Sequence, residues 1–197
     1  MARIAAIVLA AGASSRMRSQ MPKALLRLPE GDTFLERVVR LAAGAGADPV
    51  VVVTGAHPLV APPPARAIHN PDWALGQLSS LRVGLAAVAL TSFDGALVAL
   101  ADHPLVRPET FVALVETFAR TGAPVVRPVH AGRRGHPVVF AACLFDELRR
   151  AELEAGARPV VARHEGHAVD VQVDDPGVVT DLDTREDLDA AGIGIVA

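Results

Sequence analysis

Unbroken hydrophobic runs recur along the chain, and stretches with hydrophobic positions at helical spacing lie between them. Runs at 4–9, 49–54 and 96–100 have the length and the β-branched content of strands buried on both faces. Such strands are typical of a parallel sheet covered by helices on both sides. Shorter hydrophobic or alternating stretches predict further strands at 67–69, 124–128, 138–140 and 168–173.

Helical spacing and capping residues predict the elements between these strands. The expected helices are 35–45, one beginning at Ser79 or Ser80 with Ser79 as N-cap, 108–120, 144–155, 159–164 and a last one capped by Thr184. At least five strand–helix alternations predict an α/β protein. We expect a single three-layer α/β/α domain over residues 1–197, with a doubly wound, mostly parallel, Rossmann-like sheet.

Composition narrows the class of protein. Hydrophobic residues make up 51% and charged residues 21%, as in globular proteins, and a net charge of −3 argues against a nucleic-acid partner. No apolar run reaches the roughly 18 residues of a membrane span. Arg3 and the apolar run after it resemble a short signal peptide, but its removal would delete the first strand, so we expect a cytoplasmic protein.

Small residues, hydroxyls and cations follow the first strand, in the sequence L-A-A-G-A-S-S-R-M-R-S-Q-M-P-K (9–23). Backbone N–H groups close to a glycine can hold phosphate oxygens, and Arg or Lys can neutralise them. The spacing fits neither G-x-x-x-x-G-K-[ST] nor G-x-G-x-x-G. We therefore predict a polyphosphate-binding loop of another kind; the alternative for Arg16 and Lys23 is an ordinary solvated surface.

Rare residue types are concentrated in this loop and in one other. Lys23 is the only lysine among 19 basic residues. Of six serines, five lie at 14–19 and 79–80, and the only asparagine (Asn70) and only tryptophan (Trp73) come just before the second stretch. Scarce polar types gathered in two loops favour specific roles for those loops.

Two aspartates are candidate metal ligands. Asp102 directly follows the strand at 96–100, and the C-terminal ends of central parallel strands are where ligands bind in open α/β sheets. Asp183 lies in the acidic segment 170–189, which holds eight acids and one arginine. Mg²⁺ uses one or two carboxylates together with phosphates and water. For Asp102 alone, capping of the next turn is the alternative.

Five motifs occur in a recognisable order: L-A-A-G-A-S-S-R-M, N-P-D-W…G…S-S-L…G-L, Asp-x-Pro at Asp102, G-H-P-V-V-F and D-L-D-T…D-L. The first resembles the signature of the MobA-like NTP transferase family, and the whole order is similar to that of molybdenum cofactor cytidylyltransferases. This resemblance covers nearly the whole chain. It implies an enzyme that joins CMP from CTP to the terminal phosphate of molybdopterin and releases pyrophosphate.

The resemblance also implies residue roles. The implied nucleotide-binding residues are Leu9, Ala10, Ala11, Gly12, Ser14, Arg16, Lys23, Gly76, Ser79 and Ser80. The implied catalytic residues are Arg16, Lys23 and Asp102; Asp102 and Asp183 would hold Mg²⁺, and His136 would face the pterin. A client molybdoenzyme is a possible partner.

Two features bear on which substrates are used. L-A-A-G and S-S-L stand where guanylyltransferases of the family show L-A-G-G and G-P-L-A-G, which favours CTP. Arg18 replaces a usual glycine, and the spacing between Arg16 and Lys23 resembles that of sugar-nucleotide pyrophosphorylases. The alternatives are therefore a sugar-1-phosphate nucleotidylyltransferase, or a non-catalytic maturation protein that carries the cofactor to a molybdoenzyme.

Overall fold

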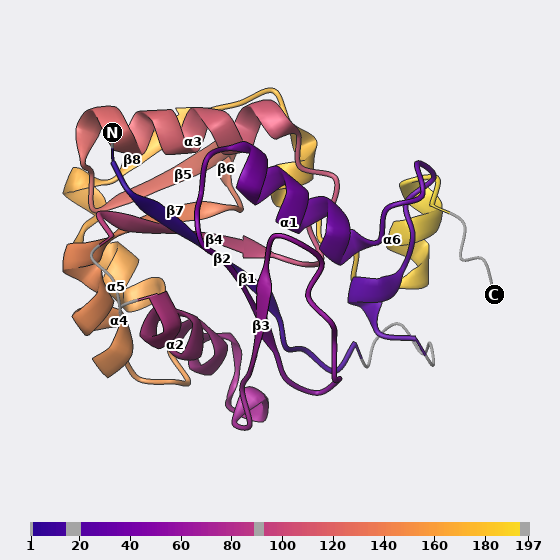
Figure 1. The fold of residues 1–197 in the computed structure, drawn as a ribbon. Coiled ribbons are helices and arrows are strands. Elements are labelled where there is room, and N and C mark those ends of the chain that lie inside the picture. The colour runs from indigo at the N-terminus through magenta and orange to yellow at the C-terminus, as the bar shows by residue number, and fades with distance from the viewer. Residues whose placement is uncertain (1, 15–20, 89–92, 194–197) are drawn as a thin grey trace.

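One eight-stranded sheet forms the centre of the molecule (Figure 1). The computed structural model describes residues 2–14, 21–88 and 93–193. The strands are β1 (Ile4–Ala10), β2 (Val50–Thr54), β3 (Arg66–His69), β4 (Gly95–Leu100), β5 (Val125–His130), β6 (Arg133–Arg134), β7 (Val138–Ala141) and β8 (Val169–Gln172). Their order is β3-β2-β1-β4-β7-β5-β6, and β8 pairs with β5.

Most strand pairs are parallel, as the sequence predicts. β1 pairs in parallel with β2 and β4, β2 with β3, and β5 with β8. β7 is antiparallel to both β4 and β5, and β6 is antiparallel to β5. A short connection after β5 allows the chain to return only in the antiparallel sense. The predicted doubly wound, mostly parallel sheet is confirmed. The sequence did not predict the strand β6, because its two residues are both arginines and form no hydrophobic pattern.

Helices cover both faces of the sheet (Figure 1). The α-helices are α1 (Phe34–Gly44), α2 (Gln77–Val88), α3 (Pro108–Thr121), α4 (Phe145–Arg150), α5 (Arg158–Arg163) and α6 (Arg185–Ala190). The 3₁₀ turns are η2 (Lys23–Leu25), η3 (Trp73–Leu75), η4 (Ala142–Leu144), η5 (Glu165–His167) and η6 (Pro176–Val179).

Two predicted helix boundaries are wrong. Gly76, which has a φ of 100°, caps the turn η3, and α2 begins directly after it at Gln77. Ser79 therefore lies inside the helix and is not its N-cap. The predicted helix 144–155 is only α4, which stops at Arg150. It stops there because Arg82 of α2 donates hydrogen bonds to the carbonyl groups of Leu148 and Ala151, where the backbone becomes extended.

Alternate residues of β1 pack into two separate cores. Ile4, Ala6 and Val8 belong to the core under α1 and α3. The odd-numbered residues 5–9 belong to the core under α2, α4 and α5. Successive side chains of a strand point to opposite faces, so a fully apolar strand supplies both layers.

A third, smaller core brings the C-terminal segment beside the start of the chain. Phe34 of α1 packs with Leu182, Leu188 and Ile193 around α6. The predicted cap of the last helix is confirmed, since Thr184 and Asp187 form a reciprocal capping box. This packing carries the acidic segment to the sheet edge where β1 ends.

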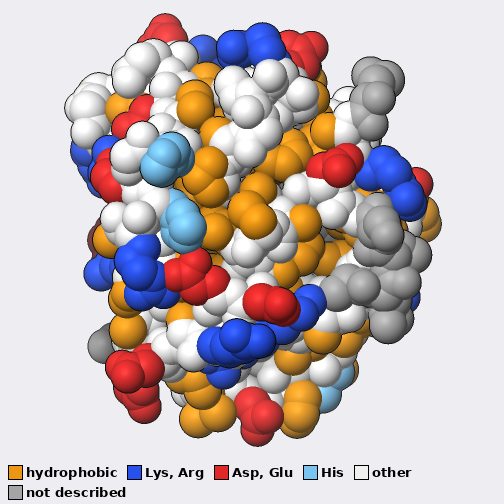
Figure 2. Space-filling model, turned by 90° about the vertical axis from the view of Figure 1, so that its left-hand side faces the viewer, with side chains coloured by type: hydrophobic (Ala, Val, Ile, Leu, Met, Phe, Trp, Pro, Cys, Tyr) orange, Lys and Arg blue, Asp and Glu red, His pale blue; other side chains and the backbone are white. Residues whose placement is uncertain are grey.

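The surface carries both charged and hydrophobic side chains. Figure 2 shows one face, on which acidic and basic side chains are interspersed among hydrophobic ones. Among the helices of the described ranges, none is long and apolar enough to cross a bilayer.

Candidate functional site

The strand order of the sheet reverses next to β1, between the loops that follow β1 and β4. From β1 the chain continues to β2 on one side, whereas β4 lies on the other side of β1. The Ala101 N–H donates a 3.0 Å hydrogen bond to the Leu9 carbonyl, which holds the two loops together. Ligands of open α/β sheets bind in the crevice at such a reversal.

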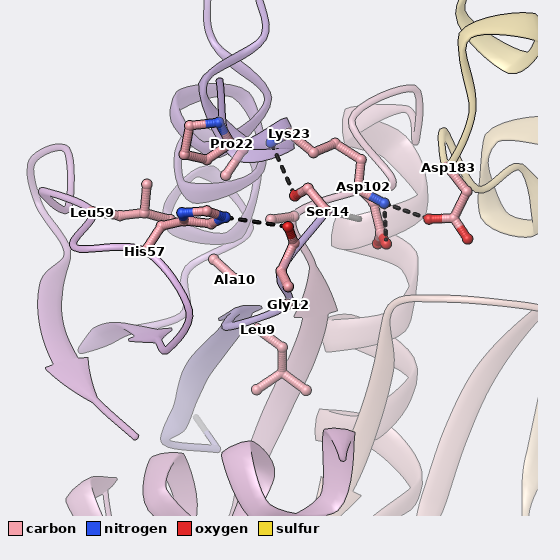
Figure 3. A pocket seen from close by; sticks show the side chains of 13 residues that line it. Leu9, Ala10, Gly12, Ser14, Pro22, Lys23, His57, Leu59, Asp102 and Asp183 are labelled. Carbon is pink, nitrogen blue, oxygen red and sulfur yellow. Dashed lines mark hydrogen bonds and ion pairs between the residues drawn. The ribbon is translucent and has the colours of Figure 1, made fainter. Parts of the chain in front are cut away.

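One ammonium group bridges two carboxylates at this crevice (Figure 3). Lys23 Nζ lies 2.9 Å from Asp102 Oδ2 and 2.5 Å from Asp183 Oδ1. The Lys23 side chain is 13% exposed, and those of Asp102 and Asp183 are 30% and 28% exposed. The structure thus brings together three residues that the sequence singled out, and leaves an excess of one negative charge among them.

Local hydrogen bonds explain how these three side chains meet. The Leu182 N–H donates to the Asp102 carbonyl at 3.1 Å, which places Asp183 next to the β4 loop. The Asp183 N–H donates to Asp187 Oδ2 at 3.0 Å, within the cap of α6. Ser14 Oγ accepts a 3.1 Å hydrogen bond from the Lys23 N–H, which holds Ser14 next to Lys23.

Lys23 and Asp102 stabilise each other in their charged forms. Burial opposes ionisation of Asp102, but the charge and hydrogen bond of Lys23 outweigh it and hold the pKa of Asp102 below its usual value. Burial likewise opposes protonation of Lys23, yet the two carboxylates hold the pKa of Lys23 above its usual value. Near neutral pH Lys23 and Asp102 therefore form a charged pair.

A cavity of about 250 Å³ opens above this cluster. The lining residues are Leu9, Ala10, Gly12, Ala13, Ser14, Pro22, Lys23, Ala24, His57, Leu59, Ala101, Asp102 and Asp183. Sequence reasoning missed His57, whose Nε2 lies 3.3 Å from the Ala13 carbonyl oxygen. The feature that could have identified His57 is its position just after β2, because the loops after neighbouring parallel strands reach the same sheet edge.

Only part of the predicted phosphate-binding loop lines this cavity. A Cβ placed on Gly12 would meet nothing within 4 Å, so the backbone there faces open space that a ligand can approach. Ala11, a predicted nucleotide-binding residue, is buried behind the cavity, and its carbonyl accepts a hydrogen bond from Ala56. Arg16, predicted to be catalytic, and Arg18 lie outside the described residues.

The donor set fits a hard divalent cation. Two carboxylate oxygens converge on one point, now marked by the Lys23 ammonium. Within the ranges that the structure describes, no three His, Cys, Asp or Glu side chains are grouped to hold a metal ion. A site with two carboxylates suits Mg²⁺ or Mn²⁺ bound together with phosphate oxygens and water.

A second and larger cavity of about 990 Å³ meets the first at Leu9, which lines both. Its lining comes from the sheet, α2 and α5 and combines apolar residues, for example Leu81, Val98 and Phe140, with charged ones, for example Arg127, Arg134 and Glu165. His136 and Gly76, both predicted to bind substrates, also line it. The two cavities together offer room for two substrates side by side.

His136 is a neutral side chain in the wall of this second cavity. Burial, and to a smaller extent the nearby His103 ring, lower the pKa of His136 to about 4. The two rings meet edge to face at 5.5 Å, and His103 Nε2 lies 2.7 Å from Asp181 Oδ1. Among the described atoms, neither Nδ1 has a hydrogen-bond partner.

The two serines of α2 lie behind the second cavity. Ser79 and Ser80 are 6% and 3% exposed, and both hydroxyls accept hydrogen bonds from Asn70 Nδ2, at 2.9 and 3.0 Å. Neither serine lines either cavity. The expected presentation of these hydroxyls at a helix start is therefore wrong, because α2 begins two residues earlier.

A network of four charges at one end of the second cavity has no counterpart in the sequence analysis. Arg127 of β5 is 5% exposed and pairs with Asp170 at 2.6 Å and Glu165 at 2.7 Å. Arg134 contacts the same two acids. Burial opposes the charge of Arg127, but hydrogen bonds to the acids hold its pKa above the usual value. The network joins β5, β6, β8 and η5.

Replacing Gly135, which precedes His136, with alanine is expected to destabilise the protein. A Cβ there would lie 2.0 Å from the Val178 carbonyl oxygen, which already accepts a hydrogen bond from the His136 N–H at 2.9 Å. We expect the free energy of unfolding to fall by about 1–3 kcal/mol, as for other overpacked sites, measured by urea denaturation. Gly166→Ala is the control, since nothing lies within 4 Å of a Cβ there. Equal stability of the two variants would contradict this prediction.

Comparison with known proteins agrees with this geometry. The profile of the family described as "MobA-like NTP transferase domain" matches residues 6–169. The molybdenum cofactor cytidylyltransferase of Escherichia coli K12 is 26% identical over 95% of this chain and 94% of its own length. The bifunctional protein GlmU of Caulobacter vibrioides is 36% identical over 64% of this chain, but this chain covers only 25% of that protein.

Solved structures agree as well. Rv0371c of Mycobacterium tuberculosis H37Rv is 27% identical, with a TM-score of 0.78 over 98% of this chain and 100% of that one. A structure of Rv0371c in complex with manganese superposes with a TM-score of 0.70 at 25% identity, over 95% of this chain and 97% of that one.

Proposed function

The chain belongs to the MobA-like NTP transferase family, and on that premise we propose that it is a metal-dependent cytidylyltransferase acting on molybdopterin. In the proposed reaction, an oxygen of the terminal phosphate of molybdopterin attacks the α-phosphorus of CTP. The bond between the α-phosphorus and the bridging oxygen breaks, and pyrophosphate leaves. The E. coli cytidylyltransferase, which is similar over almost its whole length, supports this choice.

The observation that carries the proposal is the meeting of two different cavities at Leu9. The first contains a cation and two carboxylates, which suits a triphosphate and its metal. The second is large and is lined by apolar residues together with charged ones, which suits an acceptor that carries both a broad ring system and a phosphate. A reaction between two phosphates requires both substrates at such a junction.

Each part of the first cavity has a proposed role. The backbone around Gly12, with Arg16 and Lys23, would hold the triphosphate, and Leu9 and Ala10 would lie under the ribose and base. Asp102 and Asp183 would hold Mg²⁺, which when bound neutralises charge on the phosphates. Because Lys23 lies between these carboxylates, its ammonium would be close enough to the metal-binding groups to neutralise charge on the α-phosphate.

The second cavity would hold the acceptor. His136 lines it as a neutral ring, so it can orient a neutral polar group of the pterin without adding charge. Gly76 belongs to the segment 74–77, which lines the same cavity as Leu9 and would face the base of the nucleotide. The ring system of molybdopterin would occupy the apolar part of this cavity, and its terminal phosphate would reach the junction.

A sugar-1-phosphate nucleotidylyltransferase is the second candidate. The GlmU relatives and the spacing between Arg16 and Lys23 favour it. A non-catalytic cofactor carrier is the third. Incubation with each NTP, Mg²⁺ and either molybdopterin or a sugar 1-phosphate separates the three, because pyrophosphate is released only with the true acceptor and never by a carrier.

The proposed selectivity for CTP can be tested without any acceptor. A ligand at 100 times its Kd stabilises a protein by about 2.7 kcal/mol, which for a chain of this size raises Tm by about 5–10 °C. Thermal unfolding with Mg²⁺ and equal concentrations of the four NTPs should therefore show the largest shift with CTP. A larger shift with GTP, or four equal shifts, would refute the selectivity.

A further inference from the structure

Asn70 connects the start of α2 to the loop before it. Its side chain is 1% exposed, and its Nδ2 donates to Ser79 Oγ at 2.9 Å and to Ser80 Oγ at 3.0 Å. Its Oδ1 accepts a 3.0 Å hydrogen bond from the Asp72 N–H. Its own N–H donates to the Thr54 carbonyl at the end of β2, at 2.8 Å. Through its side chain and its backbone, Asn70 thus has partners on α2, on β2 and in the loop between β3 and α2.

The direction of these hydrogen bonds is determined by chemistry. An amide NH₂ group only donates, so Ser79 Oγ accepts from Asn70 and must give its own proton to another acceptor. The acceptors within reach are the carbonyl oxygens of Gly76 at 2.8 Å and Asp72 at 2.9 Å. Asn70 therefore acts through Ser79 on the loop 72–76.

That loop forms a wall of the second cavity. Residues 74–78 line it, and Leu9, where the two cavities meet, lines it as well. Leu75, Gly76 and Gln77 are exposed, whereas the two serines behind them are buried. The exposed face of the wall is therefore available to a ligand, and the buried face is held by Asn70 and the serines.

From this arrangement, and resting on the proposed function, we infer that Asn70 is a positioning residue for nucleotide selectivity. It holds the wall 74–77 at the distance and orientation at which the base of the bound nucleotide is discriminated. Asn70 itself touches no substrate. The serines, which the family resemblance implies as nucleotide-binding residues, act as its intermediates.

The test compares Asn70→Asp, Asn70→Ala and Ser79→Ala in steady-state kinetics with each of the four NTPs. A carboxylate cannot donate, so in Asn70→Asp the Ser79 hydroxyl must turn toward residue 70 and leave the loop carbonyls. We expect the ratio of kcat/KM for the preferred NTP to that for the next to fall about tenfold, through KM, with kcat within about threefold of wild type. The double variant of Asn70→Ala and Ser79→Ala should lose no more selectivity than either single variant.

Thr110→Ala is the matched control. Thr110 is 3% exposed and its hydroxyl donates to Asp175 Oδ2 at 2.7 Å, but it lines neither cavity. It should lose stability as Asn70→Ala does and keep the wild-type selectivity.

The outcomes separate the inference from the proposed function. Variants that fold and discriminate NTPs as wild type does would overturn the role of Asn70. If Asn70→Ala does not fold, Asn70→Asp and Ser79→Ala decide the same question. A wild-type chain that prefers a nucleotide other than CTP, with that preference lost in the variants, would support the inference while refuting CTP. A wild-type chain that binds no nucleotide would overturn both.

Discussion

Asp102→Asn is expected to lower kcat for nucleotidyl transfer by about 10²–10³-fold or more, the loss typical of removing one group that stabilises charge in a transition state. Asparagine keeps the shape of the side chain but removes one of the two carboxylates that converge at the site. Lys23 Nζ, which lies 2.9 Å from Asp102 Oδ2, would then face either the NH₂ group of the asparagine, which is a donor like the ammonium itself, or its uncharged oxygen. Pyrophosphate release at saturating CTP and Mg²⁺ measures the effect.

Two controls separate this loss from a change in folding or in total charge. Asp189→Asn removes the same charge from an exposed position of α6, outside the cavity, and should leave kcat unchanged. Asp102→Asn should also bind Mn²⁺ more weakly in calorimetry, with an unchanged circular dichroism spectrum, because Asp102 lies in a loop after β4. Turnover close to that of wild type at ordinary Mg²⁺ concentrations would show that the assignment of Asp102 is wrong.

Lys23→Arg is expected to reduce kcat nearly as much as Lys23→Ala, while KM for CTP rises only modestly. Lys23 Nζ fits between two carboxylates at 2.5 and 2.9 Å with its side chain 13% exposed. A guanidinium is longer, planar and forked, and it cannot replace a compact ammonium there. The choice of lysine in a chain with 18 arginines out of 19 basic residues agrees with such a requirement.

Steady-state kinetics of both variants test this prediction, with Arg27→Lys as the control. Arg27 is exposed in the same N-terminal segment and does not line the cavity, so exchange of the two cations there should change neither kcat nor KM. Retention of most activity in Lys23→Arg would mean that Lys23 supplies only general positive charge to the triphosphate.

Much of the fold follows from local patterns in the sequence. Apolar runs of strand length predict buried parallel strands because each residue of β1 enters one of two cores. The cap at Thr184 is likewise local, since Thr184 and Asp187 are three residues apart. Gly12, Lys23 and Asp102 stand out for the same reason: each lies at, or shortly after, the end of a predictable strand.

Other features depend on contacts between distant segments, which no local pattern encodes. Asp183 meets Lys23 across 160 positions of sequence, and the Leu182 hydrogen bond to Asp102 together with the third core brings them together. Ser79 and Ser80 turn inward because Asn70, nine and ten positions earlier, lies behind them.

The amino-acid sequence by itself predicted most elements of this protein, the class of its sheet and the loops after β1 and β4 that line the first cavity, because these depend on residues within a few positions of one another. Tertiary structure alone decided that β7 runs antiparallel, that His57 joins the first cavity and that Arg127 is buried in an ion-pair network. It also decided that a second, larger cavity meets the first at Leu9. Cavities and buried charges arise where several elements pack together, and their free energies depend on partners that lie far away in the chain.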